Sequence, residues 1–192
     1  MWPNGYGRAA YRERMDPTAD DPPGSALRYG NPWADPPSER DPIRRARARL
    51  PAPVTVWTAG EREWAGLTVS SLMVVQGQPG RLVGLVGPDT DLAEAMEGTG
   101  AFVVHLLADR PEHRRLAQHF SGSLSADPEL LQVEPSPHGP RLLAAPDQLD
   151  CRVSSHHPFG WSELVEAEIE EVRLGPPRSG LIWYRSEFHR CQ

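Results

Sequence analysis

Hydroxyl side chains gather in one short segment of the chain, Thr68-Val69-Ser70-Ser71, at the end of a predicted strand. Because side chains alternate along a strand, Thr68 and Ser70 fall on the same face. A second polar segment, Gly87-Pro88-Asp89-Thr90-Asp91, stands at the start of a predicted helix. Free backbone N–H groups at a helix start favour an anion such as a phosphate. Together the two segments could hold the ring and the phosphate of a nucleotide cofactor.

The same two segments also have a purely structural interpretation. Thr68 and Ser70 could simply finish a strand, and Asp89 or Thr90 could simply cap the helix that follows. Helix caps of this kind are common, so spacing alone favours the structural interpretation.

The histidines show no spacing that indicates a catalytic group or a metal site. His156 and His157 are adjacent and cannot point the same way on a strand. His105, His113 and His119 lack the spacing of known metal-binding motifs. We therefore expect no metal site.

Glutamates alternate with apolar residues between Glu163 and Glu171. The even-numbered carboxylates of this run fall on one face of a predicted strand. The pattern favours a solvated outer face over a pair of catalytic carboxylates.

Composition excludes several classes of protein. The chain has 192 residues and a formal charge of −6, which argues against nucleic-acid binding through bulk electrostatics. It has no apolar run of membrane-spanning length and no secretory start. Cys151 and Cys191 are the only cysteines, which excludes a disulfide scaffold. We expect a cytoplasmic protein that binds neither nucleic acid nor a membrane.

The first 50 residues differ in composition from the rest. Prolines are frequent there and large aliphatic residues are few, so residues 1–40 are expected to form a disordered, Pro-rich tail. An alternative is that the tail's aromatic residues anchor it on a partner or a second subunit. Residues 41–50 are predicted to form a short Arg-rich helix with Asp41 as its cap and Pro42 in its first turn. Residues 51–192 are predicted to form the folded domain.

Within that domain, β-branched alternation predicts a hairpin of strands 53–59 and 63–71, which 72–75 could extend. Helices are predicted at 91–97 and 111–120 and a loop-rich stretch at 123–140. The remaining predicted strands are 81–86, 101–107, 141–144, 149–155, 163–174 and 181–188. With no regular alternation of strands and helices, the pattern favours a mainly β fold, an antiparallel Greek-key barrel with two or three short helices.

Four stretches, in their order along the chain, resemble the flavin reductase-like family, whose fold is the FMN-binding split β-barrel. The stretches are VTVWTAGEREWAGLTVSSLMVV, LVGLVGPDTDLAEAMEGTGAFVVHLL, LAQHFSG and LIWYRSEFHR. The resemblance is to divergent members of the actinobacterial type.

The resemblance implies a homodimer with FMN, or FAD, near the subunit interface. It also implies reduction of the flavin by NADH or NADPH, often to supply a partner monooxygenase. Carried over by position, the segment Thr68, Val69, Ser70 and Ser71 would face the flavin ring and its ribityl chain. Asp89, Thr90 and Asp91 would form the turn at the phosphate.

Two positions depart from the family pattern. The phosphate turn holds two carboxylates, which repel a phosphate. The family's Gly-Asp-His, which positions the nicotinamide, aligns with Gly160, Trp161 and Ser162, so its histidine is replaced by Ser162. The sequence therefore leaves an alternative: a flavin-binding or interaction module of the same fold without nicotinamide-dependent activity.

Overall fold

The computed structural model describes residues 41–191, and the predicted tail (1–40) lies outside this range. The helices are α2 (Pro42–Arg47), α3 (Asp91–Thr99), α4 (Pro111–Phe120) and the 3-10 helix η1 (Pro128–Leu131). The strands are β1 (Ala52–Pro53), β2 (Thr55–Ala59), β3 (Ala65–Val69), β4 (Leu72–Val75), β5 (Gly80–Val86), β6 (Ala101–Leu106), β7 (Val133–Glu134), β8 (Arg141–Leu142), β9 (Gln148–Phe159), β10 (Ser162–Arg173), β11 (Leu181–Tyr184) and β12 (Glu187–Arg190).

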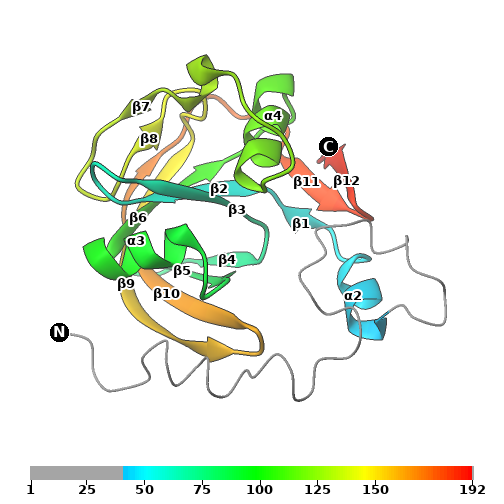
Figure 1. Ribbon diagram of the computed structural model, residues 1–192, viewed down its shortest axis with the longest axis horizontal. Helices are drawn as coiled ribbons and strands as arrows, with labels where there is room; N and C mark the ends of the chain where they lie inside the picture. The colour runs from blue at the N-terminus through cyan, green and yellow to red at the C-terminus, as the bar shows by residue number, and fades with distance from the viewer. Residues whose placement is uncertain (1–40, 192) are drawn as a thin grey trace. The chain divides into compact units, whose positions relative to one another are not determined.

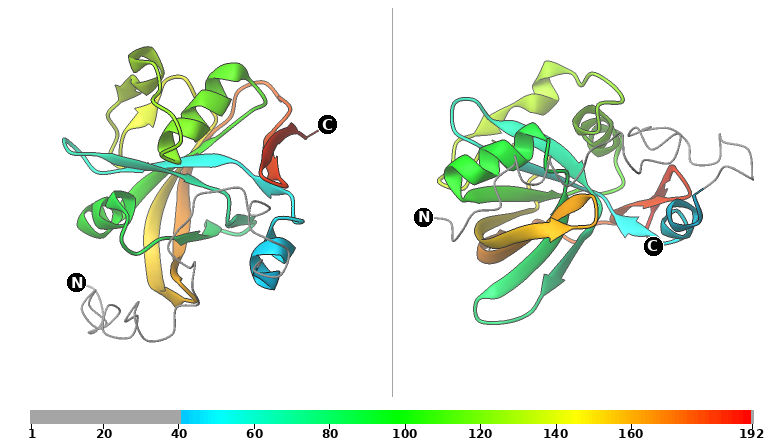
Figure 2. Two further views of the ribbon diagram at one scale, coloured as in Figure 1. Left: turned by 45° about the vertical axis from the view of Figure 1, so that its right-hand side comes forward. Right: turned by 60° about the horizontal axis from the view of Figure 1, so that its bottom comes forward.

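A seven-stranded sheet in the order β3-β2-β6-β9-β10-β5-β4 dominates the domain, and all of its pairings are antiparallel. The sheet is strongly curled, and the long β9–β10 hairpin extends from it (Figures 1 and 2). The predicted hairpin of the first two strands is confirmed as β2 and β3. The mainly β class is confirmed with it.

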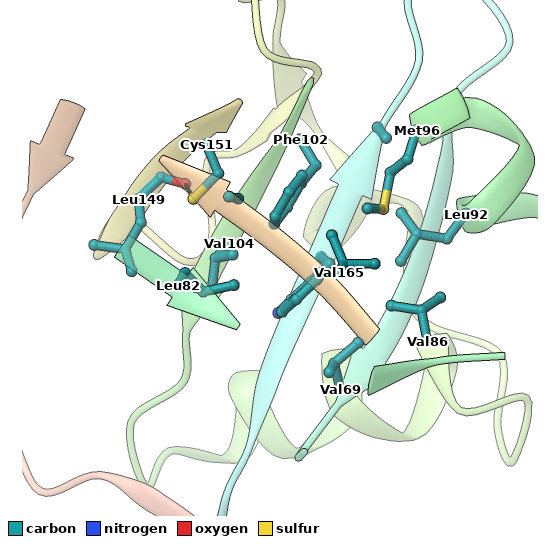
Figure 3. Close-up of a cluster of buried hydrophobic side chains, with 13 residues drawn as sticks. Val69, Leu82, Val86, Leu92, Met96, Phe102, Val104, Leu149, Cys151 and Val165 are labelled. Carbon is teal, nitrogen blue, oxygen red and sulfur yellow. Dashed lines mark hydrogen bonds between the residues drawn. The ribbon is translucent and has the colours of Figure 1, made fainter. Parts of the chain in front are cut away.

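The concave side of the sheet, called the inner face below, holds the main core. Trp57 on β2 stacks on Phe102 on β6 with 4.6 Å between the ring centroids. Side chains from β5, α3, β9 and β10 complete the cluster, including Val86, Leu92 and Val165 (Figure 3). Each of these residues is at most 3% exposed, so the centre of the inner face is packed, whereas Val74 on the edge strand β4 is 55% exposed.

Gly84 on β5 shows how tightly the inner face is packed. A Cβ at this position would lie 2.4 Å from the outer ring atom Cη2 of Trp57. Real Cβ atoms do not approach this closely, so the position accepts only glycine as long as Trp57 keeps its place.

A second core lies on the opposite, outer face, where α4 packs over β2. Val56, Leu116 and Leu142 are completely buried in it. Strand β8 joins this cover and is held by a buried ion pair between Arg141 and Asp150. The outer face is thus covered over β2 and β6.

Three sequence predictions of elements are corrected. Residues 72–75 do not extend β3 but form the separate strand β4, which pairs with β5. The predicted strand 181–188 is the hairpin β11–β12, because Arg185 and Ser186 adopt φ angles of 52° and 66° and form a tight turn. The stretch 123–140 contains η1 and β7 besides its loops.

The helices have the local signals that their sequences indicate. Thr90 caps α3, accepting a hydrogen bond from the Ala93 N–H, and Gly100 ends it in the left-handed conformation. The Asp41 carboxylate accepts a hydrogen bond from the Ile43 N–H at the start of α2. No helix in residues 41–191 is both long enough and apolar enough to cross a membrane.

Candidate functional site

Three segments singled out in the sequence, 68–71, 87–91 and 160–162, meet at one end of the sheet. The Leu85 N–H, at the end of β5, donates to the Ser71 carbonyl over 2.9 Å. Val86 pairs with Glu163 near the start of β10. The turn 87–90 follows β5 directly, so it lies beside both the β3–β4 connection and the β9–β10 hairpin.

The strand register assigns each side chain at this end to one of the two faces. Leu72, Gly84, Val165 and His156 lie in one row across β4, β5, β10 and β9. Gly84 faces Trp57, so this row belongs to the inner face. The adjacent row therefore points outward. It contains Ser71, Leu85, Leu164 and His157.

The outer row has two leucines in its middle, Leu85 and Leu164, with the polar Ser71 and His157 at its two ends. Leu85 and Leu164 are only half-buried, whereas their neighbours Val86 and Val165 on the inner face are buried. Along the edge strand β4, Met73 and Val75 also point outward and are 65% and 49% exposed. At this end of the sheet the outer face is apolar without being packed. Farther along β5 and β10 the same face carries Arg81, Glu166 and Glu168, as the alternation of glutamates predicts.

Residues 68–71, which carry the three hydroxyl groups, are partly in the core and partly at the surface. The Thr68 hydroxyl donates to the Ala117 carbonyl of α4 over 2.7 Å. Val69 is buried in the inner core, and its carbonyl accepts a hydrogen bond from Thr55. Ser70 and Ser71 form the β3–β4 connection and are half-buried, which leaves them as the segment's residues at the open end of the sheet.

The phosphate-turn residues surround the start of α3. The Thr90 hydroxyl donates to the Gly87 carbonyl and accepts from the Ala93 N–H. Asp89 and Asp91 are exposed. The N–H groups of Asp91 and Leu92 have no hydrogen-bond partner within residues 41–191. The two N–H donors can bind a phosphate, but the two neighbouring carboxylates repel it. The outer row has no such conflict with an aromatic ring.

Gly160 and Trp161 form the two-residue turn of the β9–β10 hairpin, and Ser162 opens β10 opposite Phe159. Gly160 has a φ of 60°, which a glycine adopts without strain. Trp161 is 69% exposed at the tip. Ser162 lies two residues before Leu164 and therefore on the outer face.

The two adjacent histidines on β9 point to opposite faces, as the sequence predicts. The His156 ring lies 3.1 Å from the Glu163 carboxylate on the inner face. His157 is exposed, pairs with Leu164 and shares the outer face with Ser162. Sequence reasoning missed His157 as a site residue because Pro158 and Phe159 continue β9 instead of separating the histidines from the hairpin turn.

Arg47 is a second residue that sequence reasoning missed. Its Nη2 donates to the Ser71 hydroxyl over 3.0 Å, across 24 positions of sequence. No sequence signal connects the two residues, since the contact depends on where the segment after α2 is held.

The other histidines identified in the sequence have structural contacts. The buried His105 contacts the Thr58 hydroxyl and the Ala145 carbonyl, and its burial lowers its pKa to about 4. His113 accepts from the Ala108 N–H and donates to the Ala144 carbonyl. Burial also lowers the pKa of His113. Within residues 41–191 no cluster of potential metal ligands is found.

Comparisons with known proteins agree on one family. Residues 47–192 match the family described as "Flavin reductase like domain". An NADH:riboflavin 5'-phosphate oxidoreductase of Streptomyces pristinaespiralis is 31% identical over 89% of this chain and 93% of its own. The reductase component of a Thermus thermophilus 4-hydroxyphenylacetate 3-monooxygenase is 29% identical, over 79% of this chain and 96% of its own.

Solved structures show the same fold. An NADH:FAD oxidoreductase of Streptomyces globisporus, in complex with NAD and FAD fragments, superposes with a TM-score of 0.68. It is 25% identical and covers 81% of this chain and 94% of its own. The flavin reductase PheA2 has a TM-score of 0.69 at 21% identity, over 77% of this chain and 95% of its own. The split-barrel prediction is confirmed, and the Streptomyces relatives agree with the expected actinobacterial affinity.

Proposed function

Since the chain belongs to the flavin reductase-like family, we propose that it binds FMN and reduces it with NADH or NADPH. FAD is the alternative flavin, because relatives are named for both flavins. The bound flavin supplies the chemistry of accepting a hydride from the nicotinamide. The protein's own residues bind, orient and shield the two rings.

The outer row at the open end of the sheet carries this proposal. Leu85 and Leu164 offer an apolar surface to the flavin ring, and Ser70 and Ser71 offer hydroxyls to its polar edge. An apolar surface with a few convergent polar groups is the usual composition of a cofactor site. The N–H groups of Asp91 and Leu92 would hold the phosphate, and Thr90 would fix the turn before them through its bonds to Gly87 and Ala93.

His157 is the group that we assign to the nicotinamide in place of the absent histidine. It lies on the same face as Ser162, on the neighbouring strand of the hairpin. A neutral imidazole can donate one hydrogen bond to a carboxamide oxygen. His156 cannot take this part, since it faces inward and contacts Glu163.

A second subunit completes the site in this proposal. Met73 and Val75 are exposed on edge strand β4, next to the outer row. Exposed apolar residues on an edge strand are typical of an interface. We therefore propose a homodimer with the flavin at the interface. Its partner would be a monooxygenase that consumes the reduced flavin, because one relative is named as such a reductase component. We place this chemistry in the cytoplasm; Cys151 and Cys191 are both unpaired.

The direct test measures NADH and NADPH oxidation by the purified full chain with added FMN or FAD, together with its mass in light scattering. We expect oxidation with at least one nicotinamide and the mass of a dimer. Ser70→Val removes one hydroxyl from the β3–β4 connection, so the free energy of FMN binding should weaken by roughly 0.5–1.5 kcal/mol. Unchanged affinity for FMN in this variant would move the flavin elsewhere.

The role of His157 is tested by two neighbouring substitutions. His157→Ala should raise the KM for the nicotinamide and leave the Kd for FMN unchanged. His156→Ala, one residue away on the opposite face, is the control and should leave both values close to wild type. Equal effects of the two substitutions on KM would show that the hairpin's shape matters and that His157 itself does not.

A second candidate function is flavin binding without nicotinamide use. It is favoured by the resemblance, which implies that Ser162 stands where the family has its histidine. If the purified protein is yellow but oxidises neither NADH nor NADPH in the presence of FMN, flavin binding without nicotinamide use is the function, and the reductase proposal is wrong.

A further inference from the structure

Arg47 is held at the flavin end of the sheet by the chain around it. After α2, the N–H groups of Arg49 and Leu50 bond back to the carbonyls of Ala46 and Arg47, which makes a tight turn. The Ala48 carbonyl accepts from the Arg185 N–H over 3.1 Å. The segment is therefore tied to the turn of the β11–β12 hairpin.

The anchor continues into the next strand. Ala52 and Pro53 form β1, which pairs with Trp183 and Ile182 of β11. Since the turn at Arg185 is fixed by two residues with positive φ, it presents the Arg185 N–H in a defined direction. Arg47 thus stands directly before a segment that is attached at Ala48 and at Ala52–Pro53, and its guanidinium reaches Ser71.

In the part of the chain that the structure describes, Arg47 lacks the carboxylate partner that several arginines on the main sheet and on α4 have. Arg81, Arg114 and Arg152 each form an ion pair with a carboxylate. Within residues 41–191, Arg47 has no carboxylate partner and contacts the neutral Ser71 hydroxyl. A guanidinium held by a hydroxyl keeps most of its donors and its full charge for an anionic group.

The chemistry of flavins supplies such a group. Reduced flavin at neutral pH is largely an anion, whose charge is shared by N1 and the C2 carbonyl on the polar edge of the ring. Oxidised flavin is neutral at the same atoms. A positive charge near that edge is one way in which a protein tunes the electronics of a flavin.

We propose that Arg47 makes the site prefer reduced FMN over oxidised FMN, by placing its guanidinium at the polar edge of the ring beside Ser71. The inference rests on the proposed function, since it takes Ser71 as a flavin contact. It assigns a redox-dependent affinity to a residue outside the hydroxyl and phosphate segments. A reductase with this preference holds its product until the product is collected.

The test is an anaerobic titration of the full chain with oxidised FMN and with FMN reduced by dithionite. The quantity of interest is the ratio of the two dissociation constants, which needs no turnover. Arg47→Gln should reduce the preference for reduced FMN by about fivefold, because a partly exposed charge pair contributes up to about that factor. Arg47→Lys should keep most of the preference, since it keeps the charge. Arg49→Gln, an exposed arginine two residues along the chain, is the matched control and should leave the ratio unchanged.

Each outcome has one meaning. An equal loss of both affinities in Arg47→Gln, or no change, would overturn the assignment while leaving flavin binding intact. A loss that occurs with FMN and disappears with riboflavin would show that Arg47 pairs with the phosphate, which also overturns it. Failure of the wild-type chain to bind either form of FMN would overturn the proposed function and this inference together.

Discussion

Over strands β2 and β6, helix α4 and residues 141–145 cover the outer face of the sheet, and Val56 and His105 are fully buried there. Over β5 and β10, Leu85 and Leu164 point from the same face and remain half-buried. The chain thus covers the outer face over β2 and β6 and leaves the apolar surface at Leu85 and Leu164 uncovered. We assign the other half to a flavin and a second subunit because apolar surface of this kind is stabilised only when something packs on it.

The covered half should lose the most stability when its buried ion pair is broken. Asp150→Ala leaves Arg141, itself 7% exposed, without its main partner. We expect the free energy of unfolding to fall by about 3–5 kcal/mol, the usual cost of an unpaired buried charge. Denaturant unfolding measures it. The double variant Arg141→Met with Asp150→Leu should recover much of the loss, and a double variant as unstable as the single one would contradict this reasoning.

The covered half should also make stability depend on pH. His105 has its pKa lowered to about 4 by burial, against 6.5 for an ordinary histidine. Between these values the unfolded chain binds a proton that the folded chain does not. The free energy of unfolding is therefore highest, as far as His105 decides it, above about pH 6.5. It falls by on the order of 3 kcal/mol as the pH drops from there towards 4.

Unfolding free energies measured from pH 7 down to pH 4 test this expectation. His105→Gln should make the curve less steep in that range, and the lowered pKa of His113 should account for part of the slope that remains. His157→Ala, which changes an exposed histidine, should leave its shape as in wild type. A curve of unchanged steepness in His105→Gln would assign the pH dependence to other groups.

The open half should show the smallest effect on stability. Leu85→Ala is expected to lower the free energy of unfolding by less than about 1 kcal/mol, because the side chain is only partly packed. Leu116→Ala in the covered half should cost about 2–5 kcal/mol. The same Leu85→Ala variant should bind FMN more weakly than wild type. Leu116→Ala should bind FMN with the affinity of wild type under conditions in which the variant is folded. Similar stability losses at the two leucines would remove the contrast between the halves.

Local signals made much of the fold predictable. The β-branched alternation over Val54 and Val56 indicated the first hairpin, and Thr90 and Gly100 marked the ends of α3. The β11–β12 hairpin was missed because its turn uses Arg185 and Ser186, which are not the residues that usually mark such turns.

At the open end of the sheet, Ser70 and Ser71 were predicted as site residues, but their neighbours from other strands were not. Ser71, Leu85, Leu164 and His157 come from four segments and meet only through the register of the sheet. The proximity of Arg47 to Ser71 likewise depends on the anchoring of the chain at Arg185.

The two-residue turn at Gly160 and Trp161 has a consequence for how this chain can evolve. Exposed loop tips ordinarily tolerate insertions, and this tip is exposed. One added residue that shifted the pairing by one position would exchange His156 and His157 between the two faces, since the side chains of a strand alternate. The length of this turn should therefore stay constant among descendants of the chain.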